Sequence, residues 1–276
     1  MITNIIKDKS TKLFIFLGGF FIANAFIAEV IGVKIFSLES TLGITPFTIP
    51  LFGNNFSFNL TAGVLLWPVV FIMTDIINEY YGEKGVRLLS YLTVVLLAYA
   101  FFMYFVAIRL VPAGWWPGSK NEQGVPDMQA AYAQIFGQGI AIILGSLVAF
   151  LIGQVVDVVV FHRIKKWSGE KYIWLRSTGS TIVSQLIDSF VVLFIAFYLY
   201  PKYISDANGK AWAFNVVMSI CIGNYIYKFI MAVLLTPVIY LVHGVIEKYL
   251  GHNLAAEMKQ AAIKDELPVD KLIDGK

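Results

Sequence analysis

Six long apolar runs limit what this chain can fold into more than any other feature of its sequence. They cover residues 13–36, 58–81, 88–110, 131–161, 177–200 and 213–240. A membrane-spanning helix needs about 20 mostly apolar residues, and each run is long enough. The third is the cleanest, because no charged residue lies between Leu88 and Ile108. The sequence therefore predicts an all-α, polytopic membrane protein with six transmembrane helices.

The composition indicates that lipid is the solvent of this chain. Hydrophobic residues make up 58% of its 276 residues and charged residues 14%, with a mean hydropathy of +0.72, whereas a soluble domain carries about 25% charge. We expect one integral domain over residues 1–246 and a polar cytoplasmic tail over residues 247–276. The first run shows no persuasive cleavage site, so we interpret it as a retained helix. Cys221 is the only cysteine, which excludes an internal disulfide and a cysteine-ligated metal cluster.

The basic residues indicate how the helices are oriented. With the N-terminus in the cytoplasm, the inner segments hold 15 lysines and arginines, and the outer loops hold three, Lys120, Lys202 and Lys210. Adding Lys34 and Arg109, near the outer helix ends, raises the outer count to five. Cytoplasmic loops of membrane proteins carry the excess of basic residues. Both termini are therefore predicted to lie in the cytoplasm.

Several ionisable residues fall inside the predicted helices, where each costs about 2.5–3.5 kcal/mol on insertion scales. Lys34 and Arg109 lie near outer helix ends, where long side chains reach the headgroups. Glu29 is near enough to Lys34 in sequence for a local pair. Glu79 is two residues from the inner end of its helix. Asp157 is about 7 Å from its own inner end at 1.5 Å per residue. Two readings are therefore open for each carboxylate, contact with water or a place in a buried site.

Asp188 and Lys228 are predicted to lie much deeper. The fifth helix begins near Ser177, eleven residues before Asp188, which places this carboxylate about 16 Å from the surface. Lys228 follows 17 uncharged residues and precedes 18 more, if His243 is neutral. An ion pair between the two residues and a substrate or proton site are both expected here, and the two interpretations are compatible.

The second apolar run ends in a polar stripe. Asp75, Asn78 and Glu79 fall at i, i+3 and i+4, so they share one face of a helix. Two carboxylates and an amide on one face of so apolar a helix indicate a site rather than a surface.

The fourth and fifth runs carry a repeated dyad of an amide and a carboxylate. Gly153-Gln154-Val-Val-Asp157 matches Ser184-Gln185-Leu-Ile-Asp188, and the i, i+3 spacing sets each amide beside its carboxylate. The first helix adds a polar residue, Asn24. The candidate substrate-binding residues are thus Asn24, Asp75, Asn78, Glu79, Gln154, Asp157, Gln185, Asp188 and Lys228.

These side chains favour a neutral or cationic solute that is rich in N–H groups. A carboxylate accepts two parallel N–H bonds, and amides donate or accept around it. An anionic substrate would instead call for arginines, which are scarce in the membrane part of the sequence.

The same residues give the chain a resemblance to a known family. It resembles the queuosine precursor transporter family, also called the vitamin-uptake-transporter-like family, first in Trp67-Pro68, Thr74-Asp75-Ile-Ile-Asn78-Glu79-Tyr-Tyr81-Gly82 and Arg87. The resemblance spans essentially all six helices and continues at Asn24, Ser146-Leu-Val-Ala149-Phe, Gln154, Asp157, Arg176-Ser177-Thr178, Ser184-Gln185, Asp188, Lys228 and Pro237.

The resemblance implies import of 7-cyano- and 7-aminomethyl-7-deazaguanine, precursors of the modified tRNA nucleoside queuosine, across a bacterial inner membrane. A guanine-like edge offers adjacent N–H and amine donors, which a carboxylate accepts in pairs. The aminomethyl form adds a cation that a second carboxylate neutralises. The expected partners are a deazapurine and the lipid bilayer, with a homo-oligomer left open and no nucleic acid.

Other function classes are weaker interpretations. A substrate-binding membrane subunit of an ATP-driven vitamin uptake system also fits six helices. Asp157 and Asp188 on adjacent helices suggest an intramembrane aspartyl protease, but the Gly-x-Gly-Asp motif is missing, so we expect no enzyme. Lys228 would repel cations in a channel. The sequence contains no Walker motif and no cofactor fingerprint, so no cofactor is expected.

Overall fold

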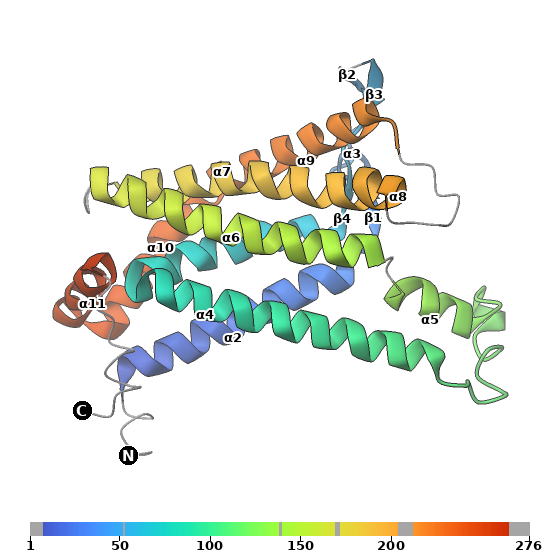
Figure 1. Cartoon of the computed structure of the whole chain (residues 1–276), viewed down its shortest axis with the longest axis horizontal. Helices are drawn as coiled ribbons and strands as arrows, with labels where there is room; N and C mark the ends of the chain where they lie inside the picture. The colour runs from blue at the N-terminus through green and yellow to red at the C-terminus, as the bar shows by residue number, and fades with distance from the viewer. Residues whose placement is uncertain (1–7, 52, 138–139, 169–171, 204–211, 265–276) are drawn as a thin grey trace.

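Long helices packed side by side form the body of the molecule (Figure 1). The computed structural model describes residues 8–51, 53–137, 140–168, 172–203 and 212–264. Helix α2, Lys9–Ile31, begins where the Asp8 carboxylate accepts a 2.7 Å hydrogen bond from the backbone N–H of Thr11. Large apolar side chains remain exposed around the bundle, among them Phe16, Tyr99, Phe102 and Leu241. An apolar exterior of this kind suits lipid rather than water.

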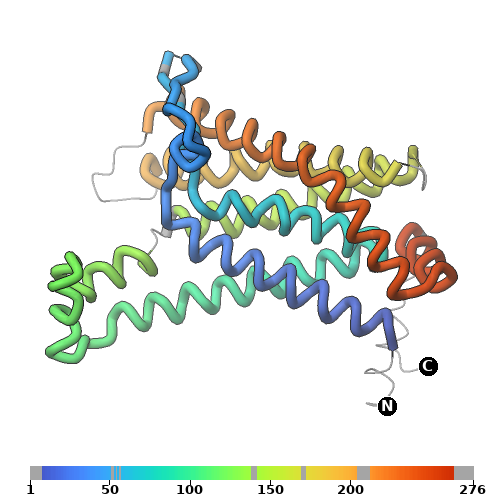
Figure 2. Tube along the Cα trace, turned by 180° about the vertical axis from the view of Figure 1, so that it is seen from behind, coloured from blue at the N-terminus to red at the C-terminus, as the bar shows by residue number. Residues whose placement is uncertain are grey.

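Helix α4, Trp67–Arg109, consists of two arms joined at one glycine. Gly82 has φ 67° and ψ −174°, a backbone conformation that is essentially restricted to glycine. The two arms therefore run in opposite directions (Figures 1 and 2). A short 3-10 helix, η1 (Ala62–Leu65), precedes the first arm. The chain thus reverses between the second and third predicted transmembrane segments.

Within the described residues, five helical stretches are long and apolar enough to cross a membrane. They are Lys9–Ile31, Ala62–Arg109, Ile142–Ser168, Ile173–Tyr203 and Phe214–Leu234. The second of these contains both arms of α4. The structure therefore confirms a predominantly helical, polytopic membrane protein.

Helices α6, Ile140–Ser168, and α7, Ile173–Phe194, lie side by side along much of their length (Figure 1). Gly145 permits their close approach, because a Cβ there would lie 3.0 Å from the carbonyl oxygen of Val192. Beyond α7 the chain continues through a π-helical turn, η3 (Ile195–Leu199), into α8 (Tyr200–Tyr203).

The single helix predicted over residues 131–161 is wrong at its start. A separate helix, α5 (Met128–Phe136), ends where Gly137 adopts φ −89° and ψ 42°, and α6 begins only at Ile140. The cause is local, because Gly137 leaves the helical conformation and so interrupts the apolar run. At its other end α6 extends to Ser168, beyond the predicted boundary.

The last apolar run is broken close to Pro237. Helix α9, Phe214–Leu234, is followed by α10, Thr236–Leu250, with Pro237 in the first turn of α10. Proline has no N–H to donate, so it belongs in the first turn of a helix, and the break in the apolar run falls just before it.

The tail beyond residue 246 continues helix α10 to Leu250 and then forms α11, His252–Lys264. Lys259 of α11 donates a 2.5 Å hydrogen bond to Glu247 of α10, which lowers the pKa of that carboxyl. Three apolar residues of α11, Ala255, Met258 and Ala262, are buried. This segment of the tail is therefore packed onto the bundle.

Short strands at one end of the bundle were not predicted. Strand β1 (Ile35–Ser37) pairs antiparallel with β4 (Asn59–Thr61), and β2 (Ile49–Leu51) pairs antiparallel with β3 (Asn54–Phe56). Between β1 and β2 lies a one-turn helix, α3 (Leu38–Thr41). Its Glu39 accepts a 2.9 Å hydrogen bond from the backbone N–H of Phe58. The first predicted helix, 13–36, therefore ends at Ile31.

The two ends of the bundle differ in what they hold. The start of α2, the turn at Gly82 and α11 lie together at one end, which we call the Gly82 end (Figures 1 and 2). The strands, α5 and α8 lie at the opposite end, which we call the strand end (Figure 1). The turn after Gly82 and helix α11 therefore lie at the same end of the bundle. The sequence assigns the basic residues of both segments to the same side of the membrane.

Candidate functional site

Helix α7 presents a polar stripe to the interior of the bundle. Arg176, Ser180, Ser184 and Asp188 follow one another at four-residue spacing, and all four are buried. Residues four apart lie on one face of a helix. At 1.5 Å per residue the stripe is about 18 Å long. Partners from α4, α6 and α9 contact it in three successive layers.

The first layer, at the Gly82 end, joins Glu79 to two cations. Arg176 binds Glu79 in a bidentate manner, with Nη2 2.7 Å from Oε1 and Nε 3.0 Å from Oε2. The Nζ of Lys165 lies 3.0 Å from the same Oε2, and each of the three side chains is only 1% exposed. The interpretation of Glu79 as a water-exposed carboxylate is therefore wrong. Both of its oxygens are held by charge-assisted hydrogen bonds that tie α4, α6 and α7 together.

The middle layer contains Asp75 of α4 and Asp157 of α6. Asp75 accepts hydrogen bonds from three hydroxyl groups of α7, those of Ser177, Ser180 and Thr181. Oδ1 of Asp157 accepts a 3.0 Å hydrogen bond from Ser184, while its Oδ2 is buried without a partner among the described residues. The two carboxyl groups are close enough to interact with each other. Asp157 is fully buried, so the expectation that it reaches water is wrong.

The third layer is an ion pair between α7 and α9. The Nζ of Lys228 lies 2.5 Å from Oδ2 of Asp188, so the predicted ion pair is confirmed. The Asp188 side chain is 13% exposed and that of Lys228 is 6% exposed. This layer is therefore buried less completely than the Glu79 layer.

A cavity of about 730 Å³ meets this third layer. Such a volume lies within the range of about 300–1,000 Å³ that is typical of small-molecule sites. Strands β3 and β4 and the segment after α2 contribute to its wall, so it lies toward the strand end. The polar side chains in its lining include Glu29, Ser146, Asp188, Ser189, Asn224 and Lys228.

Glu29 gives the cavity a second carboxylate. Its Oε2 accepts a 3.2 Å hydrogen bond from Ser146 of α6, and it interacts electrostatically with Asp188. Aromatic rings lie nearby in the lining, namely Trp67 and a stacked pair, Phe197 and Trp212, whose centroids are 4.4 Å apart. The cavity therefore combines two carboxylates and an ammonium group with flat apolar surfaces.

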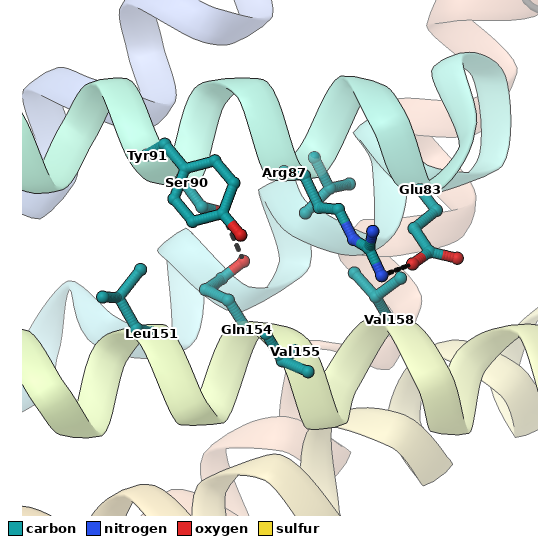
Figure 3. Close-up of a pocket in the computed structure, with 9 residues that line it drawn as sticks. Glu83, Arg87, Ser90, Tyr91, Leu151, Gln154, Val155 and Val158 are labelled. Carbon is teal, nitrogen blue, oxygen red and sulfur yellow. Dashed lines mark hydrogen bonds and ion pairs between the residues drawn. The ribbon is translucent and has the colours of Figure 1, made fainter.

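Three amide side chains beside the middle layer have unused hydrogen-bonding capacity. Within the described residues, neither the oxygen nor the nitrogen of Asn78 or Gln185 has a partner, and the same is true of Nε2 of Gln154, although all are buried. Oε1 of Gln154 accepts hydrogen bonds from Thr74 and Ser90, the second of which is drawn in Figure 3. Within the described structure, the Gln154 and Gln185 amides are therefore not hydrogen-bonded to Asp157 and Asp188, the carboxylates of their predicted dyads. A buried amide without partners is unfavourable by about 1–3 kcal/mol, so these groups are available to bind water or a solute.

The structure brings most of the sequence-predicted residues together. Asp75, Asn78 and Glu79 lie on the buried side of α4, and two of them bind α7 as their shared face predicts. Asp188 and Lys228 reach the cavity. Asn24 is different, because its amide donates a 2.8 Å hydrogen bond to the carbonyl oxygen of Phe20 in its own helix.

Several residues of the site were not among those predicted. Arg176 and Lys165 were counted with the basic residues of the inner segments, although both are buried. Ser146, Ser177 and Ser184 appeared only among the residues that carry the family resemblance, and Ser180 and Thr181 carried no distinct signal except their spacing of three or four residues. Glu29 was expected to pair with Lys34 rather than to line a cavity.

Comparison with known proteins gives the chain its family. The sequence model described as "Putative vitamin uptake transporter" matches residues 61–242. A "Probable queuosine precursor transporter" of Bacillus subtilis is 32% identical over 70% of this chain and 74% of its own length. The "Queuosine precursor transporter" of Escherichia coli is 27% identical over 75% of this chain and 81% of its own length.

A third relative, from Haemophilus influenzae, is named "Probable queuosine precursor transporter" and is 28% identical over 52% of this chain and 55% of its own length. No solved structure matches the chain. The family match covers well over half of the sequence, including the α7 stripe and all three of its layers. The chain therefore belongs to the vitamin uptake transporter family.

Proposed function

We propose that this chain imports queuosine precursors, 7-cyano- and 7-aminomethyl-7-deazaguanine, across the bacterial inner membrane into the cytoplasm. The names of the three relatives and the family membership support this class of substrate. The observation that carries the proposal is the cavity of about 730 Å³, in which two carboxylates lie among aromatic rings.

The chemistry of a deazaguanine matches the groups in this cavity. Its ring N–H and exocyclic amine are adjacent donors, which we assign to Asp188 once Lys228 has moved aside. The aminomethyl group is a cation, which we assign to Glu29. The ring itself would stack on Trp67 or on the Phe197–Trp212 pair.

The remaining predicted residues receive other places in this proposal. The amides of Asn78, Gln154 and Gln185 are proposed to meet the substrate as it moves deeper, because they have hydrogen-bonding groups without partners among the described residues. Glu79 is assigned to closing the Gly82 end. Asn24, which bonds within its own helix, is proposed to contact substrate only if α2 rearranges.

The proposed topology has six crossings and both termini in the cytoplasm. The opposite directions of the two α4 arms and the 15 basic residues of the inner segments support it. The strand end, with the cavity, would then face outward. Single cysteines at Lys120 and Trp167, with Cys221 replaced by alanine, are expected to react with a membrane-impermeant thiol reagent from opposite sides. Labelling of both from one side would contradict this topology.

Uptake by the purified chain in liposomes tests the function itself. We expect saturable uptake of radiolabelled 7-aminomethyl-7-deazaguanine that unlabelled 7-cyano-7-deazaguanine inhibits. A subunit of an ATP-driven system would show no uptake without its partner, so the same measurement separates the two functions. Absence of uptake together with absence of binding by the purified protein would refute the proposal.

Two variants sharpen the assignment of the carboxylates. Glu29→Gln is expected to weaken binding of the aminomethyl form by about tenfold, a typical worth of one charge-assisted hydrogen bond, and to change binding of the cyano form little. Asp188→Asn is expected to weaken binding of both the cyano and the aminomethyl forms. Glu122→Gln, a carboxylate in the exposed η2 turn (Asn121–Gln123) at the strand end, is the matched control. Equal losses of both ligands in Glu29→Gln would contradict its role as the cation partner.

A further inference from the structure

The middle layer of the α7 stripe has an imbalance of charge that the substrate site does not explain. Asp75 and Asp157 are both buried and interact directly with each other. Ser180 donates to Asp75 and Ser184, one turn further along α7, donates to Asp157, which places the two carboxyl groups within about one helical turn. Among the described residues, the hydrogen-bond partners of this pair are hydroxyl groups, without a cation.

The nearby cations are engaged elsewhere. Arg176 and Lys165 bind Glu79, and Lys228 binds Asp188. In the described part of the chain, neither Asp75 nor Asp157 takes part in an ion pair with any of them. Two ionised carboxylates in contact in a dry interior repel strongly, so such a pair holds a proton between its members.

The hydrogen bonds indicate which member carries that proton. The hydroxyl groups of Ser177 and Thr181 donate to Asp75, and that of Ser180 is within reach of both Asp75 and the carbonyl oxygen of Ser177, an arrangement that stabilises an ionised carboxylate. Asp157 receives one hydroxyl donor, and its buried Oδ2 has no partner within the described ranges. Protonation at Oδ2 would remove the negative charge from the oxygen to which no group donates. The geometry therefore favours a neutral Asp157 beside an ionised Asp75.

We propose that the Asp75–Asp157 pair is a proton-binding site that couples substrate import to proton entry. The O–H bond of Asp157 forms as a hydronium ion on the outer side loses a proton and becomes water, and it breaks as that proton passes to water on the cytoplasmic side and forms hydronium. One proton enters per cycle, and no other bond changes. The amides of Asn78, Gln154 and Gln185 beside the pair have unused hydrogen-bonding capacity in the described structure. They offer a route by which water or substrate can reach the pair once the helices separate.

The helices of the bundle carry other buried ionisable groups besides this pair. They are Glu29 of α2, Glu79 of α4, Lys165 of α6, Arg176 and Asp188 of α7, Lys228 of α9 and His243 of α10. Six of these seven belong to the Glu79 layer, to the Asp188–Lys228 pair or to the Tyr80–His243 contact, and Glu29 is bonded to Ser146. Because these groups have other partners in the described structure, we assign the coupling proton to the Asp75–Asp157 pair.

The inference rests on the proposed transport function, so its test compares two kinds of transport in liposomes. A pH gradient, acid outside, is expected to drive accumulation of 7-aminomethyl-7-deazaguanine in the parent protein, with inward proton movement reported by an entrapped pH dye. In Asp157→Asn, which mimics the neutral acid, we expect at least a tenfold loss of gradient-driven accumulation and no proton movement. Exchange of labelled for unlabelled substrate needs no net proton movement, so it is expected to fall less.

Two further variants keep the test decisive. Ser184→Ala removes the hydroxyl donor of Asp157, so its proton is held more tightly and the pH of half-maximal uptake is expected to rise by about one unit. Glu83→Gln, a partly exposed carboxylate on α4 near Gly82, is the matched control and is expected to keep the parent coupling. Accumulation that follows a sodium gradient and ignores the pH gradient would overturn the proposal. So would full proton coupling in Asp157→Asn.

A measurement without transport separates failure of this inference from failure of the proposed function. The purified parent is expected to show the infrared carbonyl band of a protonated carboxylic acid at neutral pH, shifted in heavy water, and Asp157→Asn is expected to lack it. Lack of any exchange by the parent would refute the transport function. Lack of the infrared band in the parent would overturn the proton site, whether or not the protein transports.

Discussion

The two ends of the α7 stripe hold similar ion pairs in opposite surroundings. At the strand end, Asp188 and Lys228 form a single pair beside a cavity of about 730 Å³. At the Gly82 end, Glu79 binds both Arg176 and Lys165 in a site that is almost completely buried. The Asp188–Lys228 pair has one contact between charged atoms and a cavity beside it. The Glu79 carboxylate has three such contacts, and none of the three side chains in its layer lines that cavity.

The Gly82 end is sealed by more than the Glu79 layer. The hydroxyl of Tyr80 lies 3.0 Å from Nδ1 of His243 in α10, and α11 covers the turn at Gly82. We call the end of the stripe that meets the cavity its open end, and the end at the buried Glu79 layer its closed end. In the proposed transport cycle, a solute would compete for the carboxylate at the open end, and its release at the other end would require the Glu79 layer to separate. An ion pair that faces a cavity is thus suited to binding, and a buried cluster of three charges is suited to closure.

The largest effect is expected from breaking the closed end. Arg176→Met leaves a buried carboxylate with one cation, so we expect the free energy of unfolding in detergent to fall by about 3–5 kcal/mol, the usual loss for a broken buried pair. Arg176→Lys keeps the charge but cannot bind Glu79 in the same bidentate manner, so it is expected to lose less stability than Arg176→Met. Chemical unfolding followed by tryptophan fluorescence measures the free energy of unfolding of each variant.

The control for this prediction is an ion pair at the same end of the molecule. Arg87 pairs with Glu83, but its side chain is 54% exposed, and exposed pairs contribute about 0–1 kcal/mol. Arg87→Met is therefore expected to change stability little. Similar losses in Arg87→Met and Arg176→Met would show that burial does not distinguish the two pairs.

Sequence reasoning predicted the open end of the stripe better than the closed end. The depth of Asp188 and Lys228 could be counted from the lengths of uncharged runs, and the need to neutralise both then predicts their pairing. Arg176 and Lys165 lie close to helix ends, where basic residues normally reach water. Which of them fold inward depends on where Glu79 meets α7, and that is a tertiary contact with no local signal.

The fold shows the same division between local and tertiary causes. Run length alone predicts the long apolar helices, and Pro237 predicts a break in the last of them because it lacks an N–H. The short pairing of β1 with β4 could not be predicted from three-residue segments, since their partners are more than 20 residues apart. The roles of Ser177, Ser180 and Thr181 likewise become visible only when Asp75 is placed against α7.

The turn between the α4 arms is expected to give the next largest effect. Gly82→Ala forces a Cβ into a backbone conformation that only glycine adopts readily, and this Cβ would lie 3.3 Å from the carbonyl oxygen of Ala262 in α11. We expect a loss of up to about 3 kcal/mol in the free energy of unfolding. In Gly19→Ala, a helical position with nothing within 4 Å, stability is expected to stay level or rise. A Gly82→Ala variant as stable as the parent would show that the turn tolerates another conformation.

The smallest effect on stability, with a large effect on transport, is expected at the open end. Asp188→Asn and Lys228→Met each strand one charge, but the Asp188 side chain is 13% exposed to the cavity, where water compensates part of the loss. We expect each single variant to lose about 1–2 kcal/mol, and the double variant to regain much of it because no charge is left unpaired. All three are expected to lose uptake, since in the proposed site the substrate takes the place of Lys228 at this carboxylate. A double-mutant cycle of unfolding free energies in detergent, with uptake measured in parallel, tests both parts. Strictly additive stability losses would show that the two residues do not stabilise each other, and full uptake by the double variant would remove them from the substrate site.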